Sequence, residues 1–218
     1  MGTVAWPIQV TRRRGEEWAM RTRADRVRRL DPDRSGPPRG AVAAAALVLV
    51  LTWTGSIGRA AWAKDPIFAT MAVAHDTSGS EAPGFTLATP EGQTLALSSF
   101  RGRVVFLNFW ATWCPPCRLE MPSMERLHQE FKDQGLAILA VDIEESPKLV
   151  AKFMREFRLT FPALLDSDSR VSSRYAVRGL PTTVLIDRRG RIAGRAIGPR
   201  EWTSPEGRAL IRSLLERG

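Results

Sequence analysis

Cys114 and Cys117 are the only thiols of the chain, and two prolines separate them. An apolar and aromatic run, Val104 to Trp110, precedes them, and core-sized residues follow at helical spacing: Leu119, Met124, Leu127 and Phe131. The pattern predicts a buried strand, a tight turn and a helix whose first turn carries a dithiol. The first N–H groups of a helix have no intrahelical partners and carry partial positive charge, so they stabilise an anion. We therefore expect the pKa of Cys114 to be lowered and its thiolate to react near neutral pH.

The two sulfur atoms occupy different places in this pattern, which suggests different roles in thiol–disulfide exchange. Cys114 precedes the helix, so we expect its sulfur to be the more exposed and to attack a partner disulfide. Cys117 lies within the first turn and would then resolve the mixed disulfide. A purely structural disulfide is the weaker interpretation, because so short a loop constrains the unfolded chain very little.

The cysteine and histidine counts disfavour a metal site. A structural zinc ion takes four Cys or His ligands. Here the Cys-x-x-Cys pair has no second pair, and the chain contains only two histidines. We therefore expect no metal and no bound cofactor, with the reversible Cys114–Cys117 disulfide as the redox group.

Strand and helix patterns alternate around the dithiol. Two short strands, 85–87 and 95–97, flank a turn before it. After the first helix, Leu136–Val141 is a continuous apolar run, typical of a strand buried on both faces. The expected elements that follow are helix 147–157, strand 159–164, helix 171–176, strands 183–186 and 191–197, and helix 205–215. This order predicts an α/β domain: a central mixed β-sheet flanked by helices, with an N-terminal β-hairpin and a βα insertion.

We expect that domain to cover residues 83–218, a length that buries about two thirds of the chain surface without a disulfide staple. The residues before it differ in composition. Residues 1–40 are rich in Arg, Pro and Gly, which predicts a disordered basic tail. Residues 41–57 carry no charge and are just long enough to cross about 30 Å of hydrocarbon as a helix. Residues 64–82 are interpreted as a linker.

Two interpretations of residues 41–63 remain open. The arginine-rich flank orients the N-terminus toward the cytoplasm in both, so both place the domain outside the membrane. The long basic segment favours an uncleaved single-pass anchor in the cell membrane, our first expectation. Ala61-Trp62-Ala63 fits a signal-peptidase site, and cleavage there would release a periplasmic or secreted protein.

The formal net charge of +9 raises the question of nucleic-acid binding. Residues 1–40 hold ten arginines against five acidic residues, so +5 of that charge lies in the tail beside the apolar run. No basic helix and no known nucleic-acid motif accompanies it. We therefore expect no nucleic-acid partner.

Taken together, these residues resemble the thioredoxin fold, and more narrowly the membrane-anchored extracytoplasmic thiol–disulfide oxidoreductases of the TlpA/ResA type, related to the AhpC/TSA redoxins. The resemblance covers residues 83–218. Its matching segments are Phe109-Trp-Ala-Thr-Trp-Cys-Pro-Pro-Cys117, Glu120-Met-Pro122, Gly179-Leu-Pro-Thr-Thr183 and the insert from Glu144 to Asp166. A lone Cys-x-x-Cys is a weak signal, but this combination is specific.

The resemblance gives Glu120 a role. Thioredoxins carry an aspartate six residues before the first cysteine, and here that position is Asn108, which cannot ionise. The extracytoplasmic branch resembles this chain in carrying an acid at Glu120, one helical turn after Cys117. We expect its carboxyl beneath the dithiol, with a pKa raised by burial, where it would accept the proton of Cys117. The alternative is a solvated acid that merely suits the helix dipole.

By the same resemblance, the peptide bond before Pro181 is cis, and Pro181 faces the dithiol. It would hold the backbone of Leu180 ready to pair with an extended partner segment; an ordinary trans proline is the alternative. The prolines between the cysteines lack N–H groups, and so remove donors that could stabilise the Cys114 thiolate. We expect the partner to be contacted by residues around these two sites: Trp113, Pro115, Pro116, Gly179, Leu180 and Thr182.

The resemblance implies a reductant that takes electrons from a membrane thiol carrier and reduces cysteines of exported proteins. Its targets would include the haem-attachment cysteines of apocytochrome c or copper-site cysteines of an oxidase assembly protein. We expect a monomer. Three alternatives remain: a disulfide-forming oxidase, a thiol peroxidase, and a non-catalytic scaffold. A reduction potential near about −270 mV indicates a reductant and one near about −120 mV an oxidase.

Overall fold

The computed structural model describes residues 65–217, so the predictions for the basic tail and for the anchor or signal peptide lie outside the described residues. The strands are β1 (Ala74–His75), β2 (Thr86–Ala88), β3 (Thr94–Ala96), β4 (Val104–Trp110), β5 (Leu136–Ile143), β6 (Ala163–Asp166), β7 (Thr182–Ile186) and β8 (Ile192–Ile197). The helices are α1 (Pro66–Thr70), α2 (Pro115–Phe131), α3 (Pro147–Glu156), α4 (Arg170–Arg174) and α5 (Pro205–Glu216), with short 3-10 turns η1 (Leu97–Phe100) and η2 (Lys132–Gln134). No helix within residues 65–217 has the length and apolar character needed to cross a bilayer.

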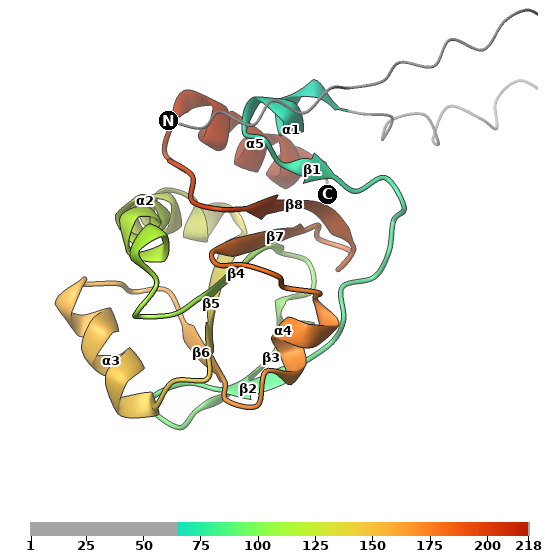
Figure 1. Cartoon of the computed structure of the whole chain (residues 1–218). Coiled ribbons are helices and arrows are strands. Elements are labelled where there is room, and N and C mark those ends of the chain that lie inside the picture. Colours follow the sequence, from blue (N-terminus) through green and yellow to red (C-terminus); the bar gives the residue numbers. More distant parts are fainter. Residues whose placement is uncertain (1–64, 218) are drawn as a thin grey trace, which may run out of the picture. The chain divides into compact units, whose positions relative to one another are not determined.

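The strands form one mixed sheet in the order β1-β8-β7-β4-β5-β6-β2-β3 (Figure 1). β4, β5 and β6 run parallel to one another, and β7 pairs antiparallel with β4. The hairpin β2–β3 adds to the β6 edge, and β8 adds to β7. This is the mixed sheet with an N-terminal hairpin that the sequence predicts.

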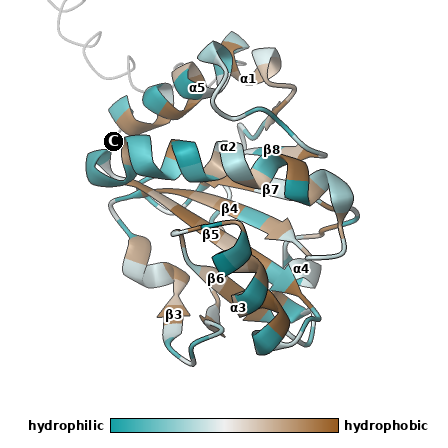
Figure 2. Ribbon diagram, turned by 90° about the vertical axis from the view of Figure 1, so that its left-hand side faces the viewer, coloured by the Kyte–Doolittle hydropathy of each residue, from teal (hydrophilic) through white to brown (hydrophobic). Residues whose placement is uncertain are grey.

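β4 is buried along its whole length because both faces of the sheet are covered. Side chains alternate along a strand, so its residues divide between two cores. Val104, Phe106 and Trp110 face a core closed by α1, α2, α3 and α5. Val105, Leu107 and Phe109 face a second core closed by α4 and by residues of the β2–β3 region. Figure 2 shows α2 lying across the sheet, whose strands are largely hydrophobic.

Four helices begin in the same way, with a capping side chain followed by a proline at the first helical position. Asp65, Ser146 and Ser204 cap α1, α3 and α5 by accepting a hydrogen bond from a backbone N–H of the first turn. In α2 the capping position is occupied by Cys114. The dithiol therefore lies at a helix start of the same type as the starts of α1, α3 and α5.

The structure corrects the interpretation of residues 64–82 as a linker. α1 and β1 lie within this stretch; Phe68 of α1 is buried, and β1 pairs antiparallel with β8. A five-residue helix is too short to show a helical repeat of apolar residues, so its single buried anchor cannot be recognised from the sequence pattern. The folded unit therefore includes residues well before Pro83.

Candidate functional site

The two cysteines lie at the start of α2 and are joined by a disulfide, with an S–S distance of 2.01 Å and a Cα–Cα distance of 5.3 Å. Pro115 and Pro116 occupy the first two positions of the helix and have no N–H to donate. The first available donor is therefore the N–H of Cys117, which lies 3.2 Å from the Sγ of Cys114. A thiolate at Cys114 would have this single first-turn donor where most helices offer three.

Burial of the dithiol differs from the expectation. Cys114 is 2% exposed and Cys117 is 0% exposed, so the contrast between the two sulfurs is small in this disulfide form. Both cysteines belong to the core that α2 covers. Trp113, immediately before them, is 67% exposed and thus the more accessible side chain.

The segment before β7 lies at the same end of the sheet as the dithiol, because Thr182 pairs with Phe109 near the end of β4. The Leu180–Pro181 peptide bond is cis, as predicted. The Oγ1 of Thr182 donates to the Gly179 carbonyl at 2.7 Å, and the Pro181 carbonyl accepts from the Gly198 N–H at 2.8 Å. Within residues 65–217, the structure shows no hydrogen bond to the backbone of Leu180.

Glu120 is buried, with 2% of its surface exposed, in a cage of three hydrogen-bond donors. Nδ2 of Asn108 donates to Oε1 at 2.8 Å, while the backbone N–H of Arg200 and Nε1 of Trp202 donate to Oε2 at 3.2 and 3.3 Å. Asn108 is itself oriented by a second bond from Nδ2 to Thr183 Oγ1 at 3.0 Å. The carboxyl is therefore held between the central strand and the segment that precedes α5.

Burial raises the pKa of Glu120 to about 7, as expected for a carboxyl removed from water. The three hydrogen bonds and the positive charge of Arg200 oppose this rise without cancelling it. A carboxyl with this pKa exchanges its proton near neutral pH, which is where a general base is most effective. The alternative of a solvated first-turn acid is wrong.

A pair of carboxyl groups, Asp142 and Glu145, contacts the chain at Thr112, two residues before Cys114, and the sequence pattern did not reveal it. Both carboxylate oxygens of Glu145 accept from Thr112, from its N–H at 2.5 Å and from its hydroxyl at 2.6 Å. The Glu145 N–H donates to Oδ1 of Asp142 at 3.3 Å. Burial and the neighbouring Glu145 raise the pKa of Asp142 to about 8. The signal was available, because Trp110 ends β4 and pairs with Asp142 near the end of the neighbouring parallel strand β5, and the carboxyl ends of parallel strands meet at one edge.

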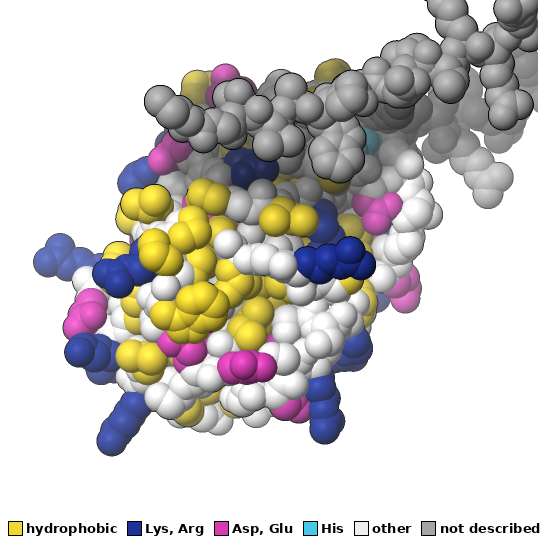
Figure 3. Space-filling model, viewed as in Figure 1, with side chains coloured by type: hydrophobic (Ala, Val, Ile, Leu, Met, Phe, Trp, Pro, Cys, Tyr) yellow, Lys and Arg dark blue, Asp and Glu magenta, His cyan; other side chains and the backbone are white. Residues whose placement is uncertain are grey.

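Several large hydrophobic side chains are exposed, and two of them, Trp113 and Leu119, lie next to the dithiol in the sequence. Within residues 65–217 these exposed side chains are Trp113, Leu119, Leu149 and Ile197, with exposures of 67, 78, 44 and 60%. Leu119, which the helical pattern suggests as a core residue, instead points outward just after Cys117. Figure 3 shows hydrophobic side chains gathered on one face of the domain. Exposed apolar groups of this size are typical of surfaces that contact other proteins.

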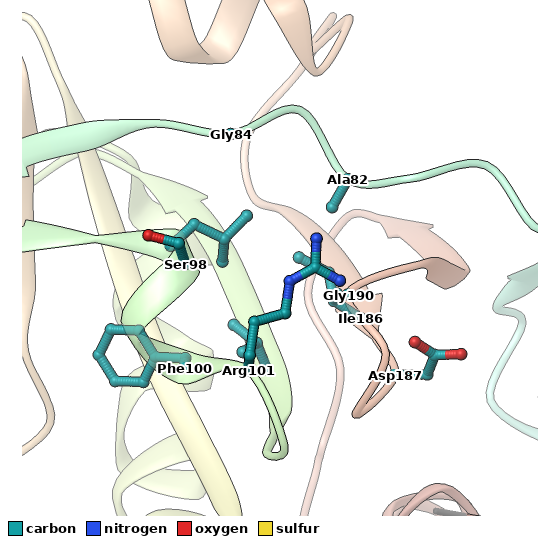
Figure 4. Close-up of a pocket in the computed structure, with 10 residues that line it drawn as sticks. Ala82, Gly84, Ser98, Phe100, Arg101, Ile186, Asp187 and Gly190 are labelled. Atoms are coloured by element: carbon teal, nitrogen blue, oxygen red, sulfur yellow. The ribbon is translucent and has the colours of Figure 1, made fainter.

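A small apolar hollow lies elsewhere (Figure 4). It is lined by Val105, at the start of β4, and by Ile186, at the end of β7, so it lies at the opposite end of these antiparallel strands from the dithiol. The side chain of Arg101 extends between Ala82 and Gly190 at its edge. In the described part of the chain, no group of three or more Cys, His, Asp and Glu side chains is placed to bind a metal ion.

A mixed sheet, a dithiol at the start of a covering helix and a cis-proline at the same end of the sheet define the class of thioredoxin-fold thiol:disulfide oxidoreductases. The family model for the AhpC/TSA family matches residues 78–195, and the chain belongs to this family. The residues that the sequence places in the site, from Trp113 to Glu120 and from Gly179 to Thr182, all lie within this match.

The relatives narrow this class further. The chain is 39% identical over 129 residues to a thiol-disulfide oxidoreductase ResA of Bacillus cereus, covering 59% of this chain and 75% of the relative. It is 44% identical over 116 residues to the ResA of Bacillus subtilis, covering 53% and 65%. A thiol:disulfide interchange protein of the thioredoxin family from Chlorobium tepidum TLS has a similar structure, with a TM-score of 0.58, 27% identity, and coverage of 64% of this chain and 99% of that one. The protein is thus an oxidoreductase that performs thiol–disulfide exchange.

Proposed function

We propose that the protein reduces disulfides of exported proteins through Cys114 and Cys117. In the dithiol form, the Cys114 thiolate attacks a partner disulfide, and one partner sulfur leaves as a thiolate that takes a proton. Cys117 then loses its proton, and its sulfur attacks the Sγ of Cys114. The second partner sulfur leaves with a proton, two electrons have passed to the partner, and the Cys114–Cys117 disulfide remains.

The observation that carries this proposal is the buried Glu120, one helical turn beyond Cys117, with a pKa of about 7. A resolving thiol in the interior must lose its proton before it attacks, and ionisation there is disfavoured by burial. Glu120 is the neighbouring group suited to accept that proton at neutral pH. The partner would lie along the segment around Pro181, where the backbone of Leu180 is available for strand pairing.

The start of α2 favours electron flow from this protein to its partner. A disulfide becomes a stronger oxidant when its reduced form is stabilised. Pro115 and Pro116 remove two N–H groups that would otherwise stabilise the Cys114 thiolate. The reduced form is therefore stabilised less than it would be with other residues there, which favours a reductant over a disulfide-forming oxidase.

The proposed setting is the outer side of a membrane. Residues 41–57 would anchor the chain, or serve as a cleaved signal, and a membrane thiol carrier would restore the dithiol. Cysteines of apocytochrome c or of an oxidase copper site are the proposed targets, in line with the resemblance to TlpA/ResA-type proteins. The folded domain would act as a monomer.

The test is an equilibrium titration of the Cys114–Cys117 pair against defined thiol buffers. A potential near about −270 mV supports the reductant, and one near about −120 mV would replace it by the oxidase. Partner identity is tested with Cys117→Ser in native membranes, which should accumulate a mixed disulfide through Cys114. Cys114→Ser is the matched control and should trap nothing.

A further inference from the structure

Residues 65–75, here called the N-terminal clip, are held against the domain by three kinds of contact. Phe68 is 1% exposed and packs in the core that α2 and α5 cover. β1 pairs with β8, placing Ala74 opposite Arg195. Asp65 forms an ion pair with Arg217 near the end of α5. The clip is therefore a fixed part of the fold at the edge beside β8 and α5.

Arg200 joins the clip to the segment before α5. Its Nε donates to the Met71 carbonyl at 2.8 Å, and its Nη2 donates to the Ala72 carbonyl at 3.1 Å. Its Nη1 donates to the carbonyls of Gly198 and Pro199, at 3.1 and 2.9 Å. One guanidinium thus bonds both the part of the clip just after α1 and the backbone just before Arg200 itself.

The same residue also reaches the site. The backbone N–H of Arg200 is one of the three donors to Glu120, and Nε1 of Trp202, two residues later, is another. Trp202 is fixed in turn, because its N–H lies 3.3 Å from the hydroxyl of Ser123. Two of the three hydrogen bonds on the buried carboxyl therefore come from a segment that the guanidinium of Arg200 joins to the clip.

We propose that the N-terminal clip positions Glu120, and that Arg200 is the positioning residue that connects them. The clip supplies two carbonyl acceptors that fix the Arg200 side chain, and the fixed backbone then presents its N–H to the carboxylate. This inference rests on the proposed role of Glu120 in exchange, which it deepens. It assigns a role at the site to residues that lie before the matched family region.

The chemistry predicts the direction of the effect. A hydrogen-bond donor and a nearby positive charge both stabilise the carboxylate, so their loss raises the pKa of Glu120 further above its ordinary value. Asn108 on β4, Trp202 and Arg200 are the groups that oppose the effect of burial, and among them Arg200 alone is charged. Loosening the clip should act in the same direction as removing the guanidinium, but less strongly.

The experiment follows the Glu120 carboxyl in the intact, oxidised protein by carbon-detected NMR across the pH range. We expect Arg200→Met to raise the midpoint by about half a unit to one unit, since it keeps the backbone N–H but removes the charge and the anchor. Arg188→Met is the matched control, because Arg188 also bonds backbone carbonyls, those of Leu215 and Gly102, away from Glu120. Equal midpoints in these two variants would overturn the proposal.

Phe68→Ala tests the clip without altering Arg200 or Glu120. We expect it to raise the same midpoint by a smaller amount, and the double variant with Arg200→Met to shift less than the sum of the two. A midpoint unchanged by Phe68→Ala, in a protein that still folds, would show that the clip does not position Glu120. Additive shifts in the double variant would lead to the same conclusion, because they would show that Phe68 and Arg200 act on Glu120 independently.

These outcomes are separate from those that test the proposed function. The NMR midpoint is measured without any partner or turnover, so it reports the pKa of Glu120 even if the protein is not a reductant. Failure of Cys117→Ser to trap a partner would count against the proposed function only. An unchanged Glu120 midpoint in Arg200→Met, with partner trapping intact, would count against the clip only.

Discussion

At the scale of single residues, the Glu120 carboxyl combines burial with three donors, and its pKa of about 7 lets it change charge within the working range. If it accepts the Cys117 proton, the rate of resolution should rise with pH through about 7, because the carboxylate is the active form. We expect Glu120→Gln to lower that rate by about a hundredfold and to remove this step from the pH profile. The rate of resolution is measured by stopped-flow detection of a small thiol released from a mixed disulfide at Cys114.

A matched control for this experiment lies on the same helix. Glu125 is half-buried and accepts from the N–H of Thr160 at 2.8 Å, in a place unrelated to the dithiol. Glu125→Gln should therefore keep both the rate and its pH dependence. A Glu120→Gln profile that still rises through pH 7 would mean that another group accepts the proton.

Asp142 gives a stability prediction of defined sign. Its folded pKa of about 8 lies above its ordinary value, so the folded state keeps a proton that the unfolded chain has already released. Stability from this group is thus greatest at low pH and is lost as pH rises toward 8. Asparagine does not titrate in either state. The wild type should therefore lose about 3 kcal/mol of its free energy of unfolding, relative to Asp142→Asn, when the pH is raised from 5 to 8. Urea titrations at both pH values test this, and a constant difference would contradict it.

At the residue level, the resemblance to a known family supplied the predictions that the structure bears out. Through that family's motifs the sequence predicts a buried Glu120 one turn from Cys117 and a cis peptide bond before Pro181, and both are present. Arg200 and Trp202 were not predicted, because they reach Glu120 from 80 and 82 residues away. Contacts of that separation depend on how the sheet is folded, and no local spacing encodes them.

At the scale of elements, we expect the first turn of α2 to influence the reduction potential, because Pro115 and Pro116 have no N–H to donate to Cys114. Pro115→Ala combined with Pro116→Ala restores two N–H groups at the positive end of the helix. The Cys114 thiolate should be stabilised and the potential should rise by about 30 mV, making the protein a weaker reductant. Redox equilibrium with glutathione measures the change.

Pro122→Ala is the control for that pair, because Pro122 lies further along the same helix and is exposed. The same chemical change there should leave the potential unaltered. Equal shifts in both variants would indicate a general effect of proline on α2 and not the loss of donors at its start.

The larger elements were predictable because their periodicity is strong. β5 and α3 begin at the predicted residues, since a continuous apolar run and an amphipathic repeat each specify one structure. The strand expected at 159–164 begins only at Ala163, because Pro162 ends the preceding turn and lacks an N–H for the sheet. α1 was missed because five residues show too little repeat.

At the scale of the whole molecule, two cores on opposite faces of one sheet supply stability, and the exposed apolar side chains add nothing to either core. Phe85, 7% exposed, lies in the core that α4 covers, while Trp113 is 67% exposed beside the dithiol. Exposed aromatic residues are effective contacts for another protein, since much of their area can be buried on binding. From this difference in burial we expect Phe85 to contribute to stability and Trp113 to contact a partner protein.

We expect Trp113→Ala to change the free energy of unfolding by less than about 0.5 kcal/mol, and to slow exchange with a protein disulfide by about tenfold. Reaction with a small disulfide should be unaffected, because it needs only the sulfur atoms. Phe85→Ala should do the reverse, costing about 3 kcal/mol or more while leaving the ratio of the two exchange rates unchanged. If Trp113→Ala slowed both reactions equally, its side chain would act on the dithiol itself, and the apolar surface around it would have no part in selecting a partner.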